Sequence, residues 1–255
     1  MAEYAAIRDL PGRLCRLRPV SGGRLERELR CVRESTIYLS TFDQLNDPFE
    51  FTAEFDFESS PEVISASLRS TEGRTGVRAD IQSAVRDSRS PYRRLQLQQM
   101  VLESTRSWGV YCLSSEFVDE AMWAYYGESH AGIAIILDST PEMVLRVVPP
   151  LFPLRVEYSD TPPTVRYWEI PADELARACR GTKSVNWRHE REWRLVGPEA
   201  GLFEVPRGMI SGLAVGLRTS SGDRRRVSQV AEECDLELFE VVKVPSSYTL
   251  QLNRI

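Results

Sequence analysis

A short and almost uninterrupted apolar run, residues 132–138 (GIAIILD), constrains the fold of this chain more than any other segment. Its four large aliphatic residues and one alanine leave no polar face, which is typical of a strand covered on both sides in the middle of a sheet. The run is too short to cross a membrane, and no other apolar run in the sequence approaches 18 residues. The segment therefore predicts a buried central strand.

Shorter strand-forming runs and amphipathic helical patterns follow one another irregularly along the rest of the chain. Leu25, Leu29 and Val32, for example, recur at helical spacing. Strands outnumber helices toward the C-terminus, which favours an α+β fold with a mixed, largely antiparallel sheet and flanking helices. The expected strands are 14–18, 37–40, 108–113, 132–138, 155–158, 187–194, 210–217, 236–243 and 248–253, and the expected helices are 23–34, 119–126, 172–179 and 222–233.

Residues 58–107 differ in composition from their surroundings, being rich in Ser, Arg, Gln and Glu and poor in strand formers. Apolar residues at helical spacing predict three helices, around 63–68, 77–85 and 95–101. The segment holds too few apolar residues for a core of its own. We therefore expect one α+β domain over residues 1–255, with a helical insertion at about 58–107.

Charge and cysteine content narrow the class of protein. The net charge is −5 and the isoelectric point about 5.3, which argues against broad binding to nucleic acid or to an anionic membrane surface. Five scattered cysteines without C-x-x-C spacing argue against a disulfide framework or a zinc site. With no apolar segment typical of a signal peptide near residue 1, we expect a cytoplasmic protein without a metal centre.

Residues 187–194 (WRHEREWR) are the most chemically dense stretch of the chain. If they form a strand, period-two alternation places Glu190 and Glu192 on one face, about 6–7 Å apart, with Arg188 and Arg194 at either end. Two neighbouring carboxylates raise the pKa of at least one of them, which suits acid–base catalysis. The alternative is that the two arginines neutralise both glutamates in an ion-pair ladder on a solvent face.

Two further segments carry candidate ligand-binding side chains. Trp123 and Tyr126 fall at i and i+3 of an expected helix, ahead of His130 and the central strand, where they can stack on a planar ligand or simply fill the core. Tyr38 and Ser40 share a face of an earlier strand and can donate hydrogen bonds.

Three other polar features are weaker candidates for chemistry. Asn46 and Asp47 are expected to form a turn through bonds to their own backbone. Ser114 ends the strand before the aromatic helix, but it lacks the G-x-S-x-G setting of a hydrolase nucleophile. The glycines show no phosphate-loop or dinucleotide spacing.

Taken in order, these segments resemble the bacterial domain-of-unknown-function 2971 family. The resemblance covers roughly residues 14–217, and the combined N-D-P-F, M-W-x-x-Y and E-x-E-W-R signatures are fairly specific. The chain departs from the family at 15–18, where Cys-Arg-Leu-Arg replaces an aromatic-Lys-aromatic-Arg run but keeps Arg18. The segments that carry the resemblance are 17–18 (LR), 37–50 (IYLSTFDQLNDPFE), 111–114 (YCLS), 122–126 (MWAYY), 130–132 (HAG) and 187–194 (WRHEREWR).

The order of three of these segments is also similar to that of mono-ADP-ribosyltransferases, which use an early arginine, a middle hydroxyl and a late Glu-x-Glu strand. This similarity implies an ADP-ribosyltransferase-like fold and NAD as the substrate. Arg18 would hold the pyrophosphate, Glu192 would be the catalytic carboxylate, and Glu190 would orient the nucleophile. The candidate cofactor-binding residues are Tyr38, Ser40, Ser114, Trp123, Tyr126, His130 and Arg194.

Two classes of function therefore stay open. One is an NAD-consuming transferase or glycohydrolase, acting as a bacterial toxin or phage-defence effector. The other is a non-catalytic module that binds a nucleotide or small metabolite, with the 58–107 helices contacting a partner. The expected partner is a small-molecule nucleotide, or for the second class a nucleotide or small metabolite, and no contact with a membrane is expected.

Overall fold

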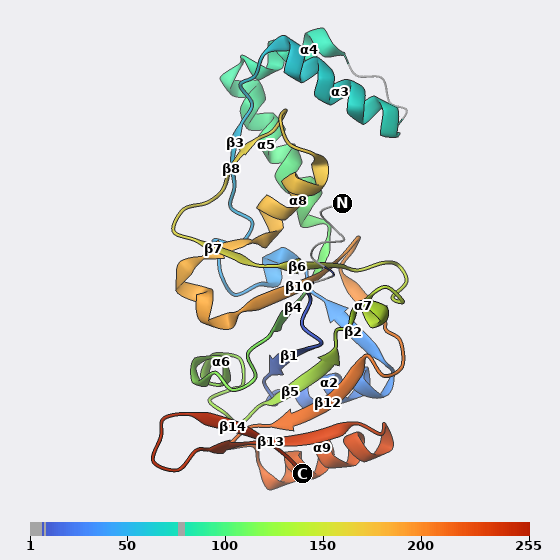
Figure 1. Ribbon diagram of the computed structural model, residues 1–255, viewed down its shortest axis with the longest axis vertical. Helices are drawn as coiled ribbons and strands as arrows, with labels where there is room; N and C mark the ends of the chain where they lie inside the picture. Colours follow the sequence, from blue (N-terminus) through green and yellow to red (C-terminus); the bar gives the residue numbers. More distant parts are fainter. Residues whose placement is uncertain (1–6, 8, 76–79) are drawn as a thin grey trace.

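The computed structural model describes residue 7, residues 9–75 and residues 80–255 (Figure 1). It has an α+β fold, as the sequence predicted. The largest sheet has the strand order β14-β13-β12-β5-β1-β4-β10-β6, in which β12 and β13 run parallel and every other neighbouring pair is antiparallel. Its strands are β1 Arg13–Arg18, β4 Gly109–Ser114, β5 Ile133–Asp138, β6 Phe152–Arg155, β10 Glu192–Gly197, β12 Ile210–Val215, β13 Glu237–Lys243 and β14 Leu250–Arg254.

The predicted central strand is β5, which lies between β1 and β12 and is covered on both faces. Its residues Ile133, Ile135 and Leu137 pack with the apolar sides of two helices, α2 (Arg24–Arg33) and α9 (Ser221–Glu233). The alternate residues Ala134 and Ile136 pack with a third helix, α6 (Glu120–Tyr125), on the opposite face. This two-sided burial explains why the segment has no polar face.

Strands β1 and β4 are paired over only a short length of the sheet. In the described chain these strands pair at Cys15 opposite Ser114, whereas β10 pairs with β4 over six positions, from Glu192–Ser114 to Gly197–Gly109. A separate two-stranded sheet of β2 (Thr36–Leu39) and β11 (Gly201–Glu204) lies next to this opening, and an isolated bridge joins Ser40 to Val110. Side chains of β1 and β4 therefore border an open space between the strands.

The segment 58–107 is helical, in agreement with the sequence-based expectation. It contains α3 (Pro61–Thr75), α4 (Ile81–Ser88) and α5 (Pro91–Arg106), and Figure 1 shows them gathered at the end of the molecule opposite α9 and β14. The part of the second expected helix at 77–79 lies outside the described residues. Ser90 caps α5 by accepting from the Arg93 backbone N–H, and Pro91 follows at the first helical position.

Several short elements complete the fold. The parallel pair of β3 (Glu54–Asp56) and β8 (Thr164–Arg166) connects the helical insertion to the rest, and β7 (Glu157–Ser159) pairs in parallel with β9 (Thr182–Ser184). The remaining elements are η1 Phe42–Gln44, α7 Pro141–Val144, α8 Ala172–Gly181 and η2 Val185–Glu190. No helix in the described part of the chain is both long enough and apolar enough to span a membrane.

The expected strand over 187–194 is wrong in its first half. Residues Val185–Glu190 form the 3₁₀ helix η2, Arg191 takes a left-handed conformation (φ 44°, ψ 50°), and β10 begins at Glu192. The Ser184 side chain caps η2 by accepting from the Asn186 backbone N–H, which gives this stretch a local start signal for a helix. The expected period-two alternation therefore starts only at Glu192.

Candidate functional site

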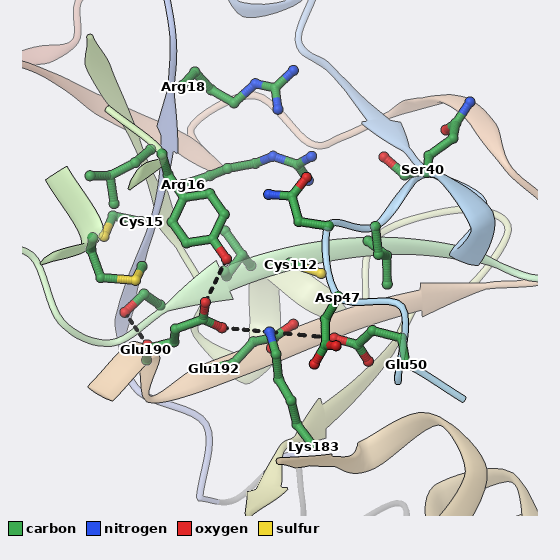
Figure 2. A pocket seen from close by; sticks show the side chains of 18 residues that line it. Cys15, Arg16, Arg18, Ser40, Asp47, Glu50, Cys112, Lys183, Glu190 and Glu192 are labelled. Atoms are coloured by element: carbon green, nitrogen blue, oxygen red, sulfur yellow. Dashed lines mark hydrogen bonds and ion pairs between the residues drawn. The ribbon is translucent and has the colours of Figure 1, made fainter. Parts of the chain in front are cut away.

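A cavity of about 170 Å³ lies where β1, β4 and the start of β10 meet (Figure 2). The loop after β2, the end of α6 and the turn between η2 and β10 complete its wall. A second cavity of about 550 Å³ adjoins the first and shares four lining residues with it, Arg16, Arg18, Ser40 and Gln44. We call them the inner and the outer cavity.

Two glutamates converge on the inner cavity because of the turn at Arg191, not because of strand alternation. Ser114, at the end of β4, donates its hydroxyl hydrogen bond to the Glu190 carbonyl, and Ser115 N–H donates to the Arg191 carbonyl. The backbone N–H of Glu192 donates to the Tyr158 hydroxyl at 2.8 Å. These bonds fix the turn, so that both carboxylates point toward the same cation.

That cation is Lys183, one of only two lysines in the chain. Its ammonium nitrogen lies 2.6 Å from Glu190 Oε2, 2.9 Å from Glu192 Oε2 and 3.3 Å from a carboxylate oxygen of Glu50 (Figure 2). The side chains are 4–7% exposed. Three carboxylates thus share one ammonium that is nearly out of contact with water, a setting in which electrostatic interactions are strong.

Arg194 completes this buried network from behind the residues that line the cavity. Its guanidinium donates to both oxygens of Glu192, at 2.8 and 3.2 Å, and to both oxygens of Glu50, at 2.9 and 2.8 Å. A further bond runs to the Arg180 carbonyl at 2.7 Å. Because Arg194 has no exposed surface and does not line the cavity, its predicted role in contacting a cofactor is wrong; it orients Glu192 and Glu50.

The alternative to a catalytic role was an ion-pair ladder in which Arg188 and Arg194 neutralise both glutamates. The ion pairs in the structure differ from that ladder. Arg194 does pair with Glu192, but Arg188 is exposed and the partner of Glu190 is Lys183. The network is buried beside a cavity, while the expected ladder lay on a solvent face. Buried charges with this many partners lose their hydration, so the network need not add to stability.

The two glutamates have opposite electrostatic environments. Burial raises the pKa of the Glu190 carboxyl above its usual value; Lys183 opposes the rise and Glu192 adds to it. Burial acts on Glu192 in the same direction, but Arg194 and Lys183 outweigh it and bring its pKa down to about 2. Glu192 is therefore held as an anion, whereas Glu190 can take up and release a proton nearer to neutral pH.

Tyr126 and Lys183 each donate a hydrogen bond to the Glu190 carboxylate and lower its pKa. The Tyr126 hydroxyl donates to Glu190 Oε1 at 2.6 Å, and burial together with Glu190 raises the pKa of that phenol. Burial alone lowers the pKa of the Lys183 ammonium, but the three surrounding glutamates reverse the effect and raise it. Both groups therefore keep their protons and act as hydrogen-bond donors to Glu190.

Arginines line the boundary between the inner and the outer cavity. Arg18 donates from Nε and Nη2 to Glu28 Oε1, each at 2.7 Å, and its side chain is 26% exposed. Arg16 lies with its guanidinium carbon 4.2 Å from the centre of the Tyr111 ring. Its Nη1 is buried without a hydrogen-bond partner in the described part of the chain, so it can donate to an acceptor supplied by a ligand.

The other predicted binding residues divide into two groups. Ser40, Ser114 and Tyr126 line the inner cavity, and Tyr38, which is 45% exposed, lines the outer cavity. Ser114 uses its hydroxyl to hold the Glu190 backbone. Of these four, Ser40 and Tyr38 are the better placed to donate to a ligand.

Trp123 and His130 do not line either cavity, so neither lies where the predicted contact with a cofactor in these cavities would place it. Trp123 is fully buried in the core between α6 and the sheet, where its indole N–H donates to the Phe117 carbonyl at 2.9 Å. His130 follows α6 in a left-handed turn (φ 69°), and its carbonyl accepts from the Arg218 N–H. Helical spacing predicted Trp123 and Tyr126 on one face of a helix, but Trp123 is buried in the core and only Tyr126 reaches the cavity.

Sequence reasoning did not assign four site residues, Arg16, Asp47, Glu50 and Lys183. Arg16 and Arg18 lie two residues apart on β1, so their side chains share one face of the strand and both reach the cavities. Lys183 stood out only by its rarity. No group of three or more His, Cys, Asp or Glu residues suited to a metal ion occurs in the described chain.

A scan against protein-family models, a search of curated proteins and a search of solved structures found no match to this chain. The resemblances drawn from its sequence therefore stay predictions.

Proposed function

We propose that this protein is an NAD-consuming, ADP-ribosyltransferase-like enzyme. The observation that carries the proposal is the adjacency of β1, β4 and β10, on which Cys15 pairs with Ser114 and Ser114 pairs with Glu192. An early arginine strand, a middle serine strand and a late Glu-x-Glu segment thus border one cavity. The similarity in motif order to mono-ADP-ribosyltransferases implies such an arrangement, which supports the proposal.

The two adjoining cavities offer room for the two halves of a dinucleotide, with arginines at their boundary. The inner cavity, at about 170 Å³, is smaller than a typical small-molecule site, whereas the outer cavity, at about 550 Å³, is within the usual range. Arg16 and Arg18 line both, so a pyrophosphate between them would meet guanidinium donors. The uncharged nucleoside half would lie in the outer cavity, with the nicotinamide riboside half inside.

The chemistry assigns different tasks to the two glutamates. The bond between the nicotinamide nitrogen and ribose C1′ breaks, nicotinamide leaves with the bonding electrons, and C1′ becomes an oxocarbenium-like cation. Glu192, held as an anion, stabilises that charge. Glu190, with its raised pKa, accepts the proton of the water or target group that attacks C1′.

The proposal is tested by measuring NAD consumption and nicotinamide release for the wild type and two variants. Glu192→Gln and Glu190→Gln are each expected to lower the turnover rate by about a hundredfold or more, because each loses a charge or a base. Glu199→Gln, at an exposed position in the turn after β10, is the matched control and should leave turnover unchanged. Melting temperatures separate lost chemistry from unfolding. Unchanged turnover in Glu192→Gln would contradict its role.

A biological consequence belongs to the same proposal, namely that the protein acts as a toxin or phage-defence effector by consuming NAD or modifying a target. Induced expression in bacteria should then arrest growth and lower cellular NAD. Glu192→Gln should relieve both effects, whereas Glu199→Gln should not. Growth arrest that persists in Glu192→Gln would separate toxicity from this site.

One observation favours a second candidate, a non-catalytic nucleotide sensor. Both carboxylate oxygens of Glu192 already accept from Arg194, and Lys183 occupies one of them as well. A sensor would show a rise in melting temperature with NAD but no nicotinamide release. Nicotinamide release that Glu192→Gln abolishes would exclude this alternative.

A further inference from the structure

Asp47 belongs to the N-D-P-F segment, and it contributes a carboxylate to the inner cavity. It is 7% exposed. Its Oδ1 accepts from the Phe49 N–H at 2.9 Å, and its carbonyl accepts from the Glu50 N–H at 3.1 Å. The predicted turn-forming role of Asp47 is therefore correct, but these bonds occupy only one of its two carboxylate oxygens.

The other oxygen, Oδ2, is buried and has no hydrogen-bond partner among the residues that the structure describes. The Asp47 side chain points toward Lys183 and Glu50 (Figure 2), yet the ion pairs of Lys183 run to Glu50, Glu190 and Glu192. A buried carboxylate oxygen without a donor is unfavourable, and such atoms in folded proteins call for an explanation. A ligand donor in the inner cavity would supply the missing bond.

The charges around Asp47 restrict what that donor can be. An ionised carboxylate only accepts hydrogen bonds, and Asp47 shares the cavity with Glu50, Glu190 and Glu192. An additional negative charge beside Asp47 would be repelled by these carboxylates, and the Lys183 ammonium is already shared by three of them. The Arg16 and Arg18 guanidiniums lie where the inner cavity meets the outer one. The ligand group beside Asp47 must therefore not be an anion and must carry an N–H or O–H donor.

We propose that Asp47 is a specificity-determining residue that accepts a hydrogen bond from the carboxamide N–H of the nicotinamide end of the substrate. This inference rests on the proposed function, which places the nicotinamide–ribose bond beside Glu190 and Glu192. The ribose hydroxyls are then taken by Glu192. The carboxamide is the remaining donor on the leaving group.

The test compares NAD with nicotinic acid adenine dinucleotide, in which a carboxylate replaces the carboxamide, by isothermal titration calorimetry. The wild type is expected to bind NAD at least about tenfold more tightly, because the analogue loses the donor and brings a charge. Asp47→Asn keeps the Oδ1 acceptor of the turn and offers an N–H₂ donor. It should therefore lower this preference about tenfold or more.

Asp43→Asn is the matched control, because Asp43 is exposed and lies in the same loop outside both cavities. It should retain the wild-type preference, and a melting temperature for each variant checks its fold. Equal binding of the two dinucleotides by the wild type would overturn the inference, as would an unchanged preference in Asp47→Asn. Lack of NAD binding by the wild type would instead refute the proposed function, and this inference with it.

Discussion

Strands β5 and β10 are equally long and almost equally buried, but they achieve burial in opposite ways. β5 presents aliphatic residues to both faces, whereas β10 buries Glu192 and Arg194 within its first three positions. The charges of β10 are compensated by Lys183 and Glu50 from other segments. Burial in this sheet therefore does not require apolar residues, but where it includes charges it requires partners brought together by the tertiary fold.

The two kinds of burial, apolar in β5 and charged in β10, differ in their effect on the free energy of folding. Well-packed apolar residues of similar volume are often as stabilising as a buried ion pair or more so, because charged groups lose their hydration on burial. The β5 region is thus explained by stability alone. The network around β10 is better explained by the proposed chemistry, which needs one permanently ionised glutamate and one that can exchange a proton.

The largest expected effect on stability is that of Arg194→Met. The change leaves Glu192 and Glu50 without their guanidinium partner in a buried setting, and we expect it to lower the free energy of unfolding by about 3–5 kcal/mol. Denaturant unfolding measures the loss, with Arg207→Met at an exposed position as the control. A loss no greater than that of the control would show that the network contributes nothing.

A somewhat smaller loss is expected for Leu213→Ala in the apolar region. Leu213 has no exposed surface, and it lies on β12 opposite Ile135 of β5. Removing its side chain should cost about 3 kcal/mol through lost burial and a residual cavity. Turnover of NAD by the folded fraction should stay at the wild-type value. A specific loss of turnover would mean that the apolar region also shapes the site.

The pH dependence of stability should separate the two regions further. The pKa of Glu192 is about 2 in the folded protein, below its ordinary value of 4.5, so its contribution is present above pH 4.5 and is lost as pH falls toward 2. The slope in this window should approach roughly 1.4 kcal/mol per pH unit. Glu192→Gln should flatten it, whereas Leu213→Ala should keep it. A slope unchanged in Glu192→Gln would assign the acid sensitivity to other groups.

The contribution of Glu190 to stability should depend on pH in the opposite sense to that of Glu192. Its pKa is raised by burial, so the folded state holds the proton more tightly than the unfolded chain does. Its contribution to stability is therefore greatest at low pH and falls as pH rises from 4.5 through the folded pKa. At pH 7, Glu190→Gln should destabilise the protein less than Glu192→Gln, in thermal or denaturant unfolding. The reverse order would contradict the division of roles between the two carboxylates.

The smallest expected change is that of Tyr126→Phe, which removes one hydroxyl. The free energy of unfolding should fall by about 1 kcal/mol, since Glu190 loses one hydrogen-bond donor. That donor helps to lower the pKa of Glu190, so its removal should raise this pKa and move the ascending limb of the pH–rate profile to higher pH. Tyr125→Phe, at an exposed position on the same helix, should leave the profile unchanged.

Local patterns in the sequence were sufficient for elements that are stabilised by their own periodicity. The apolar run at 133–138, the amphipathic helix at 24–33 and the helical character of 58–107 all follow from residue spacing. The mixed sheet also followed, because the elements mix irregularly along the chain. Strands β3, β8 and β9 were missed, since each has only three residues and depends on a distant partner, and the strand expected at 155–158 overlaps the end of β6 and the start of β7.

The candidate site was predictable only in part, for a physical reason. Glu190 and Glu192 were expected together from strand alternation, but they meet through a 3₁₀ helix and a left-handed residue. Their cation, Lys183, pairs with Glu50 across more than a hundred residues of chain, and nothing in the local sequence indicates that contact. Trp123 had the residue type of a ligand contact, but it faces the core. Ion pairs between residues far apart in the sequence position the side chains of such a site, and these pairs leave no periodic pattern in the local sequence.

The left-handed conformation of Arg191 has a consequence for which sequences can occupy this turn. The side chain is 68% exposed and pairs with Glu116 at 3.1 Å, so its chemistry is peripheral to the cavity. The backbone conformation (φ 44°) is accessible to glycine and asparagine and unfavourable for β-branched residues. The middle position of this Glu-x-Glu segment is thus constrained by its backbone torsion angles and not by contact with the cavity.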